Sequence, residues 1–414
     1  MSIIRPFKGL RPRKELVEEF SCPPYDVLEE NEVKEIVSKH PNNFLRVTRA
    51  EVEFENEIDP HSEIVYKKAK ENLEQFKKDG VLIEEKEPAL YLYRETWQGH
   101  SQTGIFATFS VEEYQKGLIK KHELTRQDKE DDRTKHIMIL EAQTGPVFLT
   151  FKSENKIKEL INSGIEKAEK IYDFIDEKEV HHELWVLTQK DLIKELENAF
   201  EKVEALYIAD GHHRAAAASR TREILKSKNP LHTGNEEYNY FMAVVFPHDE
   251  LKILDYNRVI KDLNGLSDDE FINKVSEYFD IIDAPESPYK PKSKHEFGMY
   301  INKKWYILKA KDKIIEEKDP VKQLDVYILQ NYLLDPILGI ENPRKDPRIH
   351  FLGGIRGVKA LEKWIDEKEW KVAFSMFPTS LEELMAVADD NKTMPPKSTW
   401  FEPKLRSGLL IHEI

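Results

Sequence analysis

The sequence is poor in cysteine. Cys22 is the single cysteine among 414 residues, so neither an intrachain disulfide nor a cysteine-based zinc site can form. Such a chain suits a reducing compartment, because disulfides persist only in oxidising ones. The sequence also begins without the apolar core of a signal peptide. We therefore expect a cytoplasmic protein.

Long hydrophobic runs and an excess of positive charge are lacking as well. The longest uncharged apolar run spans 241–246 and is far too short to cross a membrane. The formal net charge is −14, whereas affinity for nucleic acid comes largely from Lys and Arg contacts with phosphates. We therefore expect neither a membrane nor a nucleic acid as a partner, and the oligomeric state stays open.

The sequence does contain what a folded core requires. Hydrophobic residues make up 40% and charged residues 34% of the chain, and its length suits two or three domains. Hydrophobic periodicity predicts alternating helices and strands. Helices are expected at 29–38, 62–78, 156–170, 191–202, 321–334, 358–364 and 380–389, and strands at 43–48, 89–97, 105–114, 145–151, 181–188 and 238–247, with the pair at 89–114 forming a hairpin.

One stretch concentrates polar chemistry. It spans 206–220 and reads LYIADGHHRAAAASR. The apolar start with β-prone Tyr207 and Ile208 stops at an Asp-Gly pair, which predicts a buried strand and a turn. The alanine-rich continuation strongly favours a helix. Because the first N–H groups of a helix are unpaired and lie at the positive end of its dipole, the stretch predicts an anion site, with phosphate as the usual anion.

Five consecutive residues at this turn are candidate functional groups. Gly211 suits a tight turn or a close approach to a ligand. Arg214 could fork onto phosphate oxygens, and Asp210 could hold Mg²⁺ or a hydroxyl. His212 and His213 could donate to a phosphate or shuttle a proton. The alternative is an ordinary turn in which Asp210 caps the helix and the histidines are solvated.

A charged segment upstream supplies further candidates. The run KKHELTRQDKEDDR contains Glu123, a candidate general base. Arg133 and His136 share the segment and could add positive charge to a phosphate site. The alternative is a solvated charged loop, which describes most such runs.

The segment MPPKSTWFEPKLRS near the end of the chain is the third candidate region. Its prolines favour an extended backbone, which could present Lys397, Ser398, Thr399 and Lys404 to an anion. The alternative is a stiff strand held on the core by its Trp-Phe pair.

These motifs resemble known families. ADGHHR resembles the Gly-x-x-Arg signature of the ParB/sulfiredoxin superfamily, in the Asp-Gly-His-His-Arg form of its free-serine kinases. Those kinases pair it with an upstream His-Glu element similar to His122-Glu123. Beyond this core, the chain resembles end to end a bacterial and archaeal family of unknown function, through RPFKGLRP, PPYDV, NFLRV, HELT, GPVF, ADGHHR, MAVAD and MPPKSTWFEPKL.

The resemblance implies an α+β fold with a ParB/sulfiredoxin-like mixed αβ core. We expect an N-terminal αβ region at 1–110, the core at 111–248 and a C-terminal αβ region at 249–414. Sulfiredoxins need a catalytic cysteine inside the motif, where this sequence has histidines, so redox repair is not expected. The acidic charge also argues against DNA clamping of the ParB type.

The activity implied by the resemblance is a nucleotide-dependent phosphotransferase. Its substrate would be a small hydroxyl compound, most simply free L-serine or phosphoserine in either direction, with ATP or ADP and Mg²⁺. The implied catalytic residues are Glu123, Asp210, His212 and His213. The implied phosphate-binding residues are Gly211, His213, Arg214 and Arg133, the implied substrate-binding residues are Lys397, Ser398, Thr399 and Lys404, and the implied Mg²⁺ ligand is Asp210.

Two alternatives stay open. A non-catalytic nucleotide-binding regulator would keep the pocket and could dispense with Glu123. A metal-dependent phosphohydrolase would use Asp210 and the two motif histidines, although a second acidic cluster is lacking. For the kinase, Glu123 and Asp210 must meet across 87 positions, so the αβ segment between them has to loop out.

Overall fold

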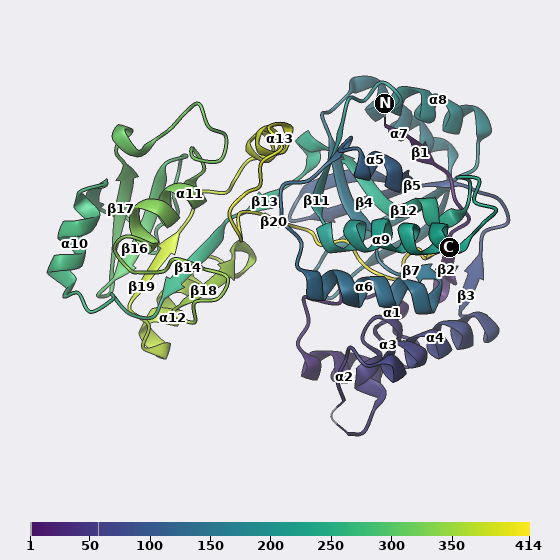
Figure 1. Ribbon diagram of the computed structural model, residues 1–414, viewed down its shortest axis with the longest axis horizontal. Helices are drawn as coiled ribbons and strands as arrows, with labels where there is room; N and C mark the ends of the chain where they lie inside the picture. The colour runs from purple at the N-terminus through teal and green to yellow at the C-terminus, as the bar shows by residue number, and fades with distance from the viewer. Residues whose placement is uncertain (1, 57) are drawn as a thin grey trace. The chain divides into compact units, whose positions relative to one another are not determined.

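The computed structural model describes residues 2–56 and 58–414, and the chain forms two compact units. The first unit comprises Met1–Leu251 and Pro403–Ile414, and the second comprises Lys252–Glu402. The regions expected at 1–110 and 111–248 thus lie in one unit. Both units contain helices and strands, which confirms the prediction of an α+β fold (Figure 1).

A mixed nine-stranded sheet is the centre of the first unit. The hairpin expected near 89–114 is present, because Tyr91 pairs with Phe106 in antiparallel register. Two neighbouring pairs, β6–β11 and β8–β12, are parallel. The strand order is β6 (Ile119–Lys120), β11 (Leu206–Asp210), β8 (Val147–Phe151), β12 (Tyr240–Pro247), β5 (His100–Ser110), β4 (Leu90–Trp97), β10 (His181–Leu187) and β9 (Glu169–Ile175), and β1 (Ile4–Arg5) also pairs with β5.

Four helices bury the apolar side chains of one face of this sheet. In α7 the buried residues Ile157, Leu160, Ile161 and Gly164 follow the helical period, so they form one stripe. In α9 the residues on the sheet side are alanines, which permit a close approach. The helices are α5 (Val111–Gln115), α7 (Asn155–Lys167), α8 (Lys190–Phe200) and α9 (His212–Lys228).

A second core lies under the N-terminal helices. The strand expected at 43–48 is wrong, because these residues form helix α3 (Leu45–Thr48). Its β-branched residues suggested a strand, but the Asn43 side chain accepts a hydrogen bond from the Leu45 N–H at 3.0 Å and starts a helical turn. The charged segment expected as a possible loop becomes α6 (Gln127–Leu140). The other elements here are β2 (Leu10–Pro12), α1 (Val17–Phe20), α2 (Glu30–Lys39), α4 (Glu63–Lys78) and β3 (Leu82–Glu84).

The second unit is built on a six-stranded antiparallel sheet. The helix expected at 321–334 is present as α11 (Asp325–Leu329) followed by a π-helical turn. The sheet order is β15 (Phe279–Asp283), β17 (Lys304–Ala310), β16 (Glu296–Ile301), β19 (Val372–Ser375), β14 (Tyr256–Ile260) and β18 (Ile349–Gly353). The remaining elements are α10 (Asp268–Ser276), α12 (Lys359–Lys368), α13 (Leu381–Asp389) and the small pair β13 (Ile253–Leu254) and β20 (Trp400–Phe401).

After the second unit the chain returns to the first. Cys22 and Ser407 exchange two backbone hydrogen bonds, of 3.0 and 2.8 Å. Further along, Ile411 pairs with Leu10, and β21 (His412–Glu413) pairs with β7 (Ala142–Gln143). The returning segment, 403–414, is therefore an integral part of the first unit.

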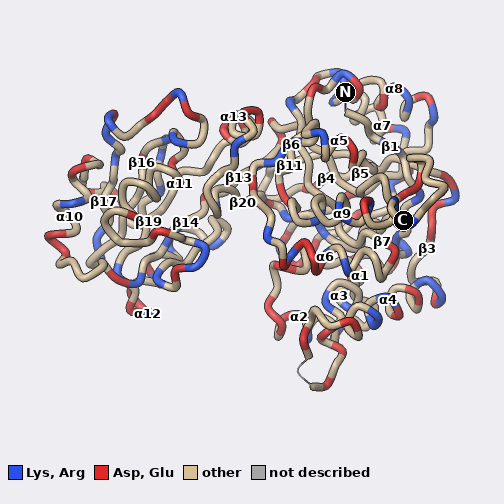
Figure 2. Tube along the Cα trace, in the orientation of Figure 1, with Lys and Arg blue, Asp and Glu red and all other residues tan. Residues whose placement is uncertain are grey.

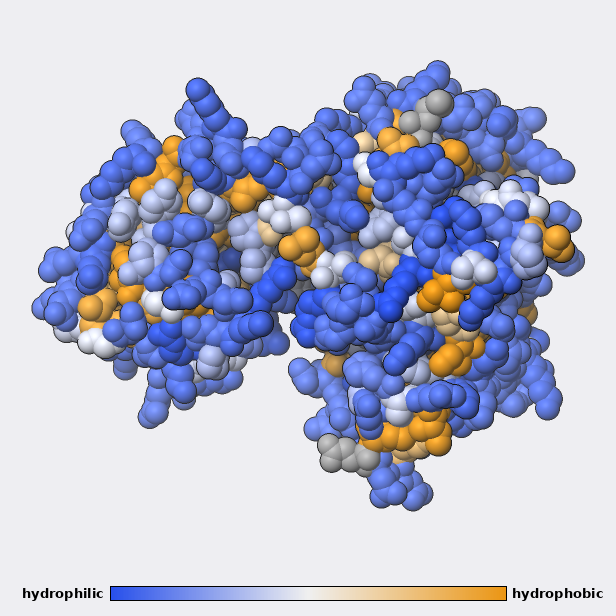
Figure 3. Space-filling view, in the orientation of Figure 1, coloured by the Kyte–Doolittle hydropathy of each residue, from blue (hydrophilic) through white to orange (hydrophobic). Residues whose placement is uncertain are grey.

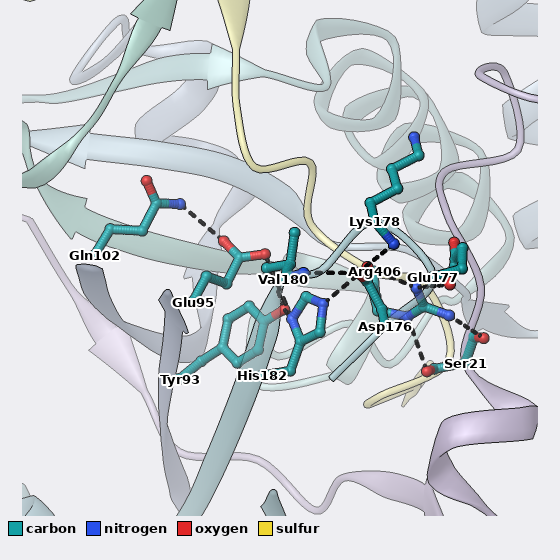
Figure 4. A network of polar contacts seen from close by, with 10 residues as sticks. All are labelled: Ser21, Tyr93, Glu95, Gln102, Asp176, Glu177, Lys178, Val180, His182 and Arg406. Carbon is teal, nitrogen blue, oxygen red and sulfur yellow. Dashed lines mark hydrogen bonds and ion pairs between the residues drawn. The ribbon is translucent and has the colours of Figure 1, made fainter. Parts of the chain in front are cut away.

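A chain of buried polar side chains lies on the other face of the first unit's sheet (Figure 4). Tyr93 donates to Glu95 at 3.0 Å, and the Gln102 amide donates to the same carboxylate at 2.8 Å. The two ring nitrogens of His182 lie 2.7 Å from the Tyr93 hydroxyl and 3.1 Å from an oxygen of Asp176. The chain thereby links two buried carboxylates through one imidazole.

Arg406 connects this polar chain to the returning segment. Its guanidinium bonds to Asp176 at 3.0 Å and to the carbonyl of Ser21 at 2.6 Å. Burial alone would raise the pKa of Asp176, but His182 and Arg406 outweigh burial, and the pKa lies well below its ordinary value. Asp176 is therefore an ionised carboxylate inside the protein.

The surface is predominantly polar. Lys and Arg are interspersed with Asp and Glu over both units (Figure 2), and the visible face has only small separate hydrophobic groups (Figure 3). Among the described residues, no helix is both long and apolar enough to cross a membrane.

Candidate functional site

Two parallel strands bring the two predicted motifs together. β6 and β11 pair in parallel, with Ile119 opposite Leu206. Parallel strands end at the same edge of a sheet, so His122, which follows β6, lies beside the motif that follows β11. The rings of His122 and His212 meet edge to face, with centroids 4.5 Å apart. The segment between the motifs does loop out, and His122, the residue before Glu123, contacts His212 of the Asp-Gly-His-His-Arg turn.

The predicted strand, turn and helix are present around Gly211. β11 ends at Asp210 and α9 begins at His212, with Gly211 between them at φ +90°. This is a left-handed conformation that glycine adopts at little cost. A Cβ on Gly211 would lie 3.4 Å from the Cα of Val147. The turn thus leaves the first N–H groups of α9 at the edge of the sheet, as an anion site requires.

Asp210 is held by two partners. Its Oδ1 accepts a hydrogen bond from the Gly211 N–H at 2.8 Å, and its Oδ2 pairs with the ammonium of Lys404 at 2.7 Å. Burial would raise the pKa of Asp210, but Lys404 and then Arg214 outweigh it and keep the pKa well below its ordinary value. Asp210 could hold Mg²⁺ through one oxygen, provided that Lys404 gives up its place on that carboxylate.

The two buried histidines are uncharged. Burial lowers the pKa of His122 to about 4, and it lowers the pKa of His212 well below its ordinary value. Among the described residues, neither His122 Nδ1 nor His212 Nε2 has a hydrogen-bond partner. These two imidazoles therefore fix the geometry of the site and supply no positive charge.

His213 differs from them because it is only partly buried. Its Nε2 accepts a hydrogen bond from the backbone N–H of Arg126 at 3.1 Å. The other ring nitrogen, Nδ1, therefore carries the proton in the neutral ring. Burial lowers the pKa of His213, so the neutral form is the stable one at pH 7.

Arg214 and Arg133 lie on the ring of Tyr25. Their guanidinium carbons are 5.8 and 4.0 Å from its centroid. Arg133 forms an ion pair with Asp132 at 2.7 Å. Arg214 donates to the carbonyl of Pro146 at 2.7 Å, and no carboxylate pairs with it in the part of the chain that the structure describes. Arg214 is thus a cation without a carboxylate partner next to the turn.

The expectation that His136 adds positive charge is wrong. His136 is buried, and this burial lowers its pKa to about 4. Its Nε2 lies 3.1 Å from the carbonyl of Val47, so the ring supports the packing of α6 on α3 as a neutral group.

The residues predicted to bind substrate are divided between the units. Lys404 belongs to the first unit and contacts Asp210. Lys397, Ser398 and Thr399 belong to the second, where Ser398 bonds to the carbonyl of Pro395 at 2.6 Å. Their predicted role stays a prediction. Glu123 is exposed at the edge of the first unit.

Four residues near the site were not predicted as site residues from the sequence. Tyr25, Thr48, Gly145 and Ser407 line one pocket with both arginines. Tyr25 lies in the family motif PPYDV and Gly145 in GPVF, Thr48 directly follows NFLRV, and Ser407 ends MPPKSTWFEPKLRS, but a single sequence does not indicate that these distant segments meet here.

The chain has low similarity to several solved structures. Solved structures with similar features include a free serine kinase in complex with AMP, at 14% identity and a TM-score of 0.35, covering 72% of this chain and 86% of that one. A conserved hypothetical protein from Pyrococcus furiosus has 12% identity and a TM-score of 0.36, and the match covers 75% of this chain and 95% of that one. SbnI from Staphylococcus aureus, with a C-terminal truncation, has 11% identity and a TM-score of 0.37, and the match covers 74% of this chain and 87% of that one.

A search of curated proteins found no match. A family profile, described as "Protein of unknown function (DUF1015)", matches residues 4–327. This match covers most of the sequence and includes both motifs of the site. The chain therefore belongs to the DUF1015 family.

Proposed function

We propose that this protein is a nucleotide-dependent phosphotransferase. It moves a phosphoryl group between ATP or ADP and the hydroxyl of a small substrate, most simply free L-serine or phosphoserine, in either direction. The observation that carries the proposal is the contact between His122, the residue before Glu123, and His212 of the anion-binding turn, at the ends of β6 and β11.

The phosphates would rest on the first N–H groups of α9. There the helix dipole and the free N–H groups favour negative charge. Arg214 adds a guanidinium that no carboxylate neutralises among the described residues. Since phosphoryl transfer depends mostly on positioning and on stabilising charge, these groups address its main requirements.

Glu123 would act as the general base. Its carboxylate takes the proton of the acceptor hydroxyl, the hydroxyl oxygen bonds to phosphorus, and the bond from phosphorus to the leaving phosphate oxygen breaks. The neutral rings of His122 and His212 would hold the base beside the turn. Bound Mg²⁺ would neutralise phosphate charge, and Asp210 is the residue that would hold it.

The remaining predicted residues would bind the acceptor and the phosphates. Lys404 can exchange its pairing with Asp210 for a substrate anion, and His213 can donate from Nδ1 to a phosphate oxygen. Lys397, Ser398 and Thr399 stay proposed substrate ligands.

A regulator that binds nucleotide without turnover is the second candidate. It is favoured by one observation, namely that both oxygens of Asp210 already have partners. In that case Lys404 would stay on Asp210 and the pocket would act only as a sensor.

Turnover distinguishes these candidates. We expect purified protein with Mg²⁺ to convert ATP and L-serine, or ADP and phosphoserine, into the corresponding products, measured by mass spectrometry. Nucleotide binding without product in either direction would favour the regulator. If product forms without added nucleotide and the protein binds no nucleotide, both the phosphotransferase and the regulator are contradicted.

Two substitutions separate chemistry from binding. We expect Glu123→Gln to lower kcat by about 100-fold or more with nucleotide affinity kept, because it removes the general base. We expect Arg214→Ala to weaken nucleotide binding at least tenfold. Matched controls are Glu159→Gln, on the exposed side of α7, and Arg220→Ala, which pairs with Asp131 on the outside of α9. Wild-type turnover in Glu123→Gln would remove this residue from the mechanism.

The glycine turn provides a third test. Gly211→Ala places a side chain at φ +90°, which costs about 1–2 kcal/mol and moves the N–H groups of the turn. Gly117→Ala, at φ +74° with open space around it, is the matched control with similar strain. We expect both to lower the melting temperature and only Gly211→Ala to weaken nucleotide binding. Equal nucleotide affinity in the two variants would place the phosphates elsewhere.

A further inference from the structure

A small pocket lies behind the anion-binding turn and is formed entirely by the first unit. It is lined by segments that are distant in sequence, with Tyr25, Thr48, Arg133, Gly145, Arg214 and Ser407 among its residues. The space open to the centres of water-sized molecules is about 30 Å³. At roughly 10–15 Å³ for one such position, it admits about two waters. This is room for one carboxylate and too little for a nucleobase.

Two buried hydroxyl groups, of Thr48 and Ser407, border the pocket. Thr48 is 7% exposed, and among the described residues its Oγ1 has no partner stronger than the weakly bonding thiol of Cys22. Ser407 is 2% exposed. An unpaired buried hydroxyl costs about 1–3 kcal/mol, so such groups are usually satisfied by water or a ligand.

Gly145 lies beside both Arg214 and the Ser407 hydroxyl. A Cβ built on Gly145 would lie 3.3 Å from the guanidinium carbon of Arg214 and 3.3 Å from the Ser407 Oγ. The arginine and the serine hydroxyl thus border the same small volume. A glycine at this position leaves that volume empty for a ligand atom.

The charge of the pocket suits one negative charge. Asp132 neutralises Arg133, whereas no described carboxylate pairs with Arg214. Asp210 is close enough to Arg214 for this arginine to lower its pKa, but Asp210 is itself paired with Lys404, so Arg133, Asp132, Arg214, Asp210 and Lys404 together carry one net positive charge. A carboxylate carries one negative charge, while a phosphate monoester carries nearly two at pH 7.

We propose that this pocket binds the carboxylate of the small acceptor. Arg214 donates one of its five N–H groups to a carboxylate oxygen and keeps others for the phosphates, and the hydroxyls of Thr48 and Ser407 donate to the carboxylate as well. Only the identity of the acceptor rests on the proposed function, since the pocket and its charge do not depend on turnover. Arg214 lies in the first turn of α9, so the bound acceptor would have its hydroxyl near the phosphate-binding N–H groups.

Binding of L-serine, of L-serinamide and of inorganic phosphate to the full chain tests this proposal by calorimetry, with and without ADP. We expect L-serine to bind at least tenfold more tightly than L-serinamide, which lacks the carboxylate. Thr48→Val, Ser407→Ala and Gly145→Ala should each weaken L-serine binding at least fivefold. Thr221→Val is the matched control, because Thr221 Oγ1 is equally buried and unpaired but lies outside the pocket.

Each result decides the question. Equal affinity for L-serine and L-serinamide, no binding of L-serine, or L-serine binding that is unchanged in all three pocket variants would overturn the proposal. Phosphate competing with L-serine more strongly in the wild type than in Ser407→Ala would assign the pocket to a phosphoryl group instead. Selective binding of L-serine without any phosphoryl transfer would uphold the carboxylate site and refute only the phosphotransferase.

Discussion

Replacing Asp176 with alanine is expected to lower the free energy of unfolding by about 3 kcal/mol, because it leaves buried His182 without its carboxylate and leaves buried Arg406 with only the half-exposed Glu177 as an acidic partner. His182 and Arg406 are close to fully buried, with side chains 1% and 5% exposed. In such surroundings an uncompensated charge costs far more than a surface ion pair contributes. Urea denaturation followed by circular dichroism measures the change.

The antiparallel pair β9–β10, whose turn contains Asp176, also offers a control. Asp173 on β9 pairs with Lys170 and His181, and its side chain is 46% exposed. Asp173→Ala should therefore change the free energy of unfolding by less than about 1 kcal/mol. Equal losses in the two variants would mean that the buried chain contributes nothing beyond ordinary surface pairing. Because the two units need not unfold together, the transition is followed by fluorescence as well as by circular dichroism, and the free energies are compared only where the two transitions coincide.

Asp325→Asn is expected to stabilise the second unit above pH 7. Asp325 is 7% exposed, and burial raises its pKa to about 7. One oxygen accepts the N–H of His295 at 2.9 Å, while the other has no partner among the described residues. The folded state therefore holds the proton, whereas the unfolded chain releases it near pH 4.

This difference in proton binding makes the free energy of unfolding depend on pH. Between about pH 4 and 7 the folded state binds more protons than the unfolded state, so the wild type loses stability as the pH rises. Asparagine does not ionise, and the advantage of the variant should grow from near zero at pH 4 to about 2–4 kcal/mol at pH 8. Asp269→Asn, on the exposed side of α10, is the control. If the melting temperatures of the wild type and Asp325→Asn change with pH in the same way, the raised pKa of Asp325 is contradicted.

The sequence predicted the local secondary structure of these segments well. The Asp-Gly pair before four alanines predicted a strand, a turn and a helix, and Gly211 has the left-handed conformation that such a turn needs. The hairpin of β4 and β5 was equally clear, because alternation and a glycine-containing loop are local signals. The helix in place of the strand at 43–48 depends on one hydrogen bond from Asn43, which outweighs the β-branched residues.

The composition of the site was harder to predict because it depends on pairing across long distances in the chain. Nothing in the run after Leu118 indicates that two residues of β6 pair with β11, 87 positions later. The resemblance to kinases suggested that Glu123 meets the turn, but not how. The neutral state of His136 and His122 depends on burial, which a charged stretch of sequence conceals.

The return of residues 403–414 to the first unit affects the order in which the protein can be completed during translation. Lys404, Arg406 and Ser407 leave the ribosome only after the whole second unit has been made. Until then Asp210 lacks its ammonium partner, and the polar chain at Asp176 lacks its arginine. The second unit has both its ends joined by a hydrogen bond of 3.2 Å between Glu402 and Lys252, so it can close on itself first. The nascent protein thus forms the Lys404–Asp210 and Arg406–Asp176 pairs last, when the returning segment completes the unit that was begun first.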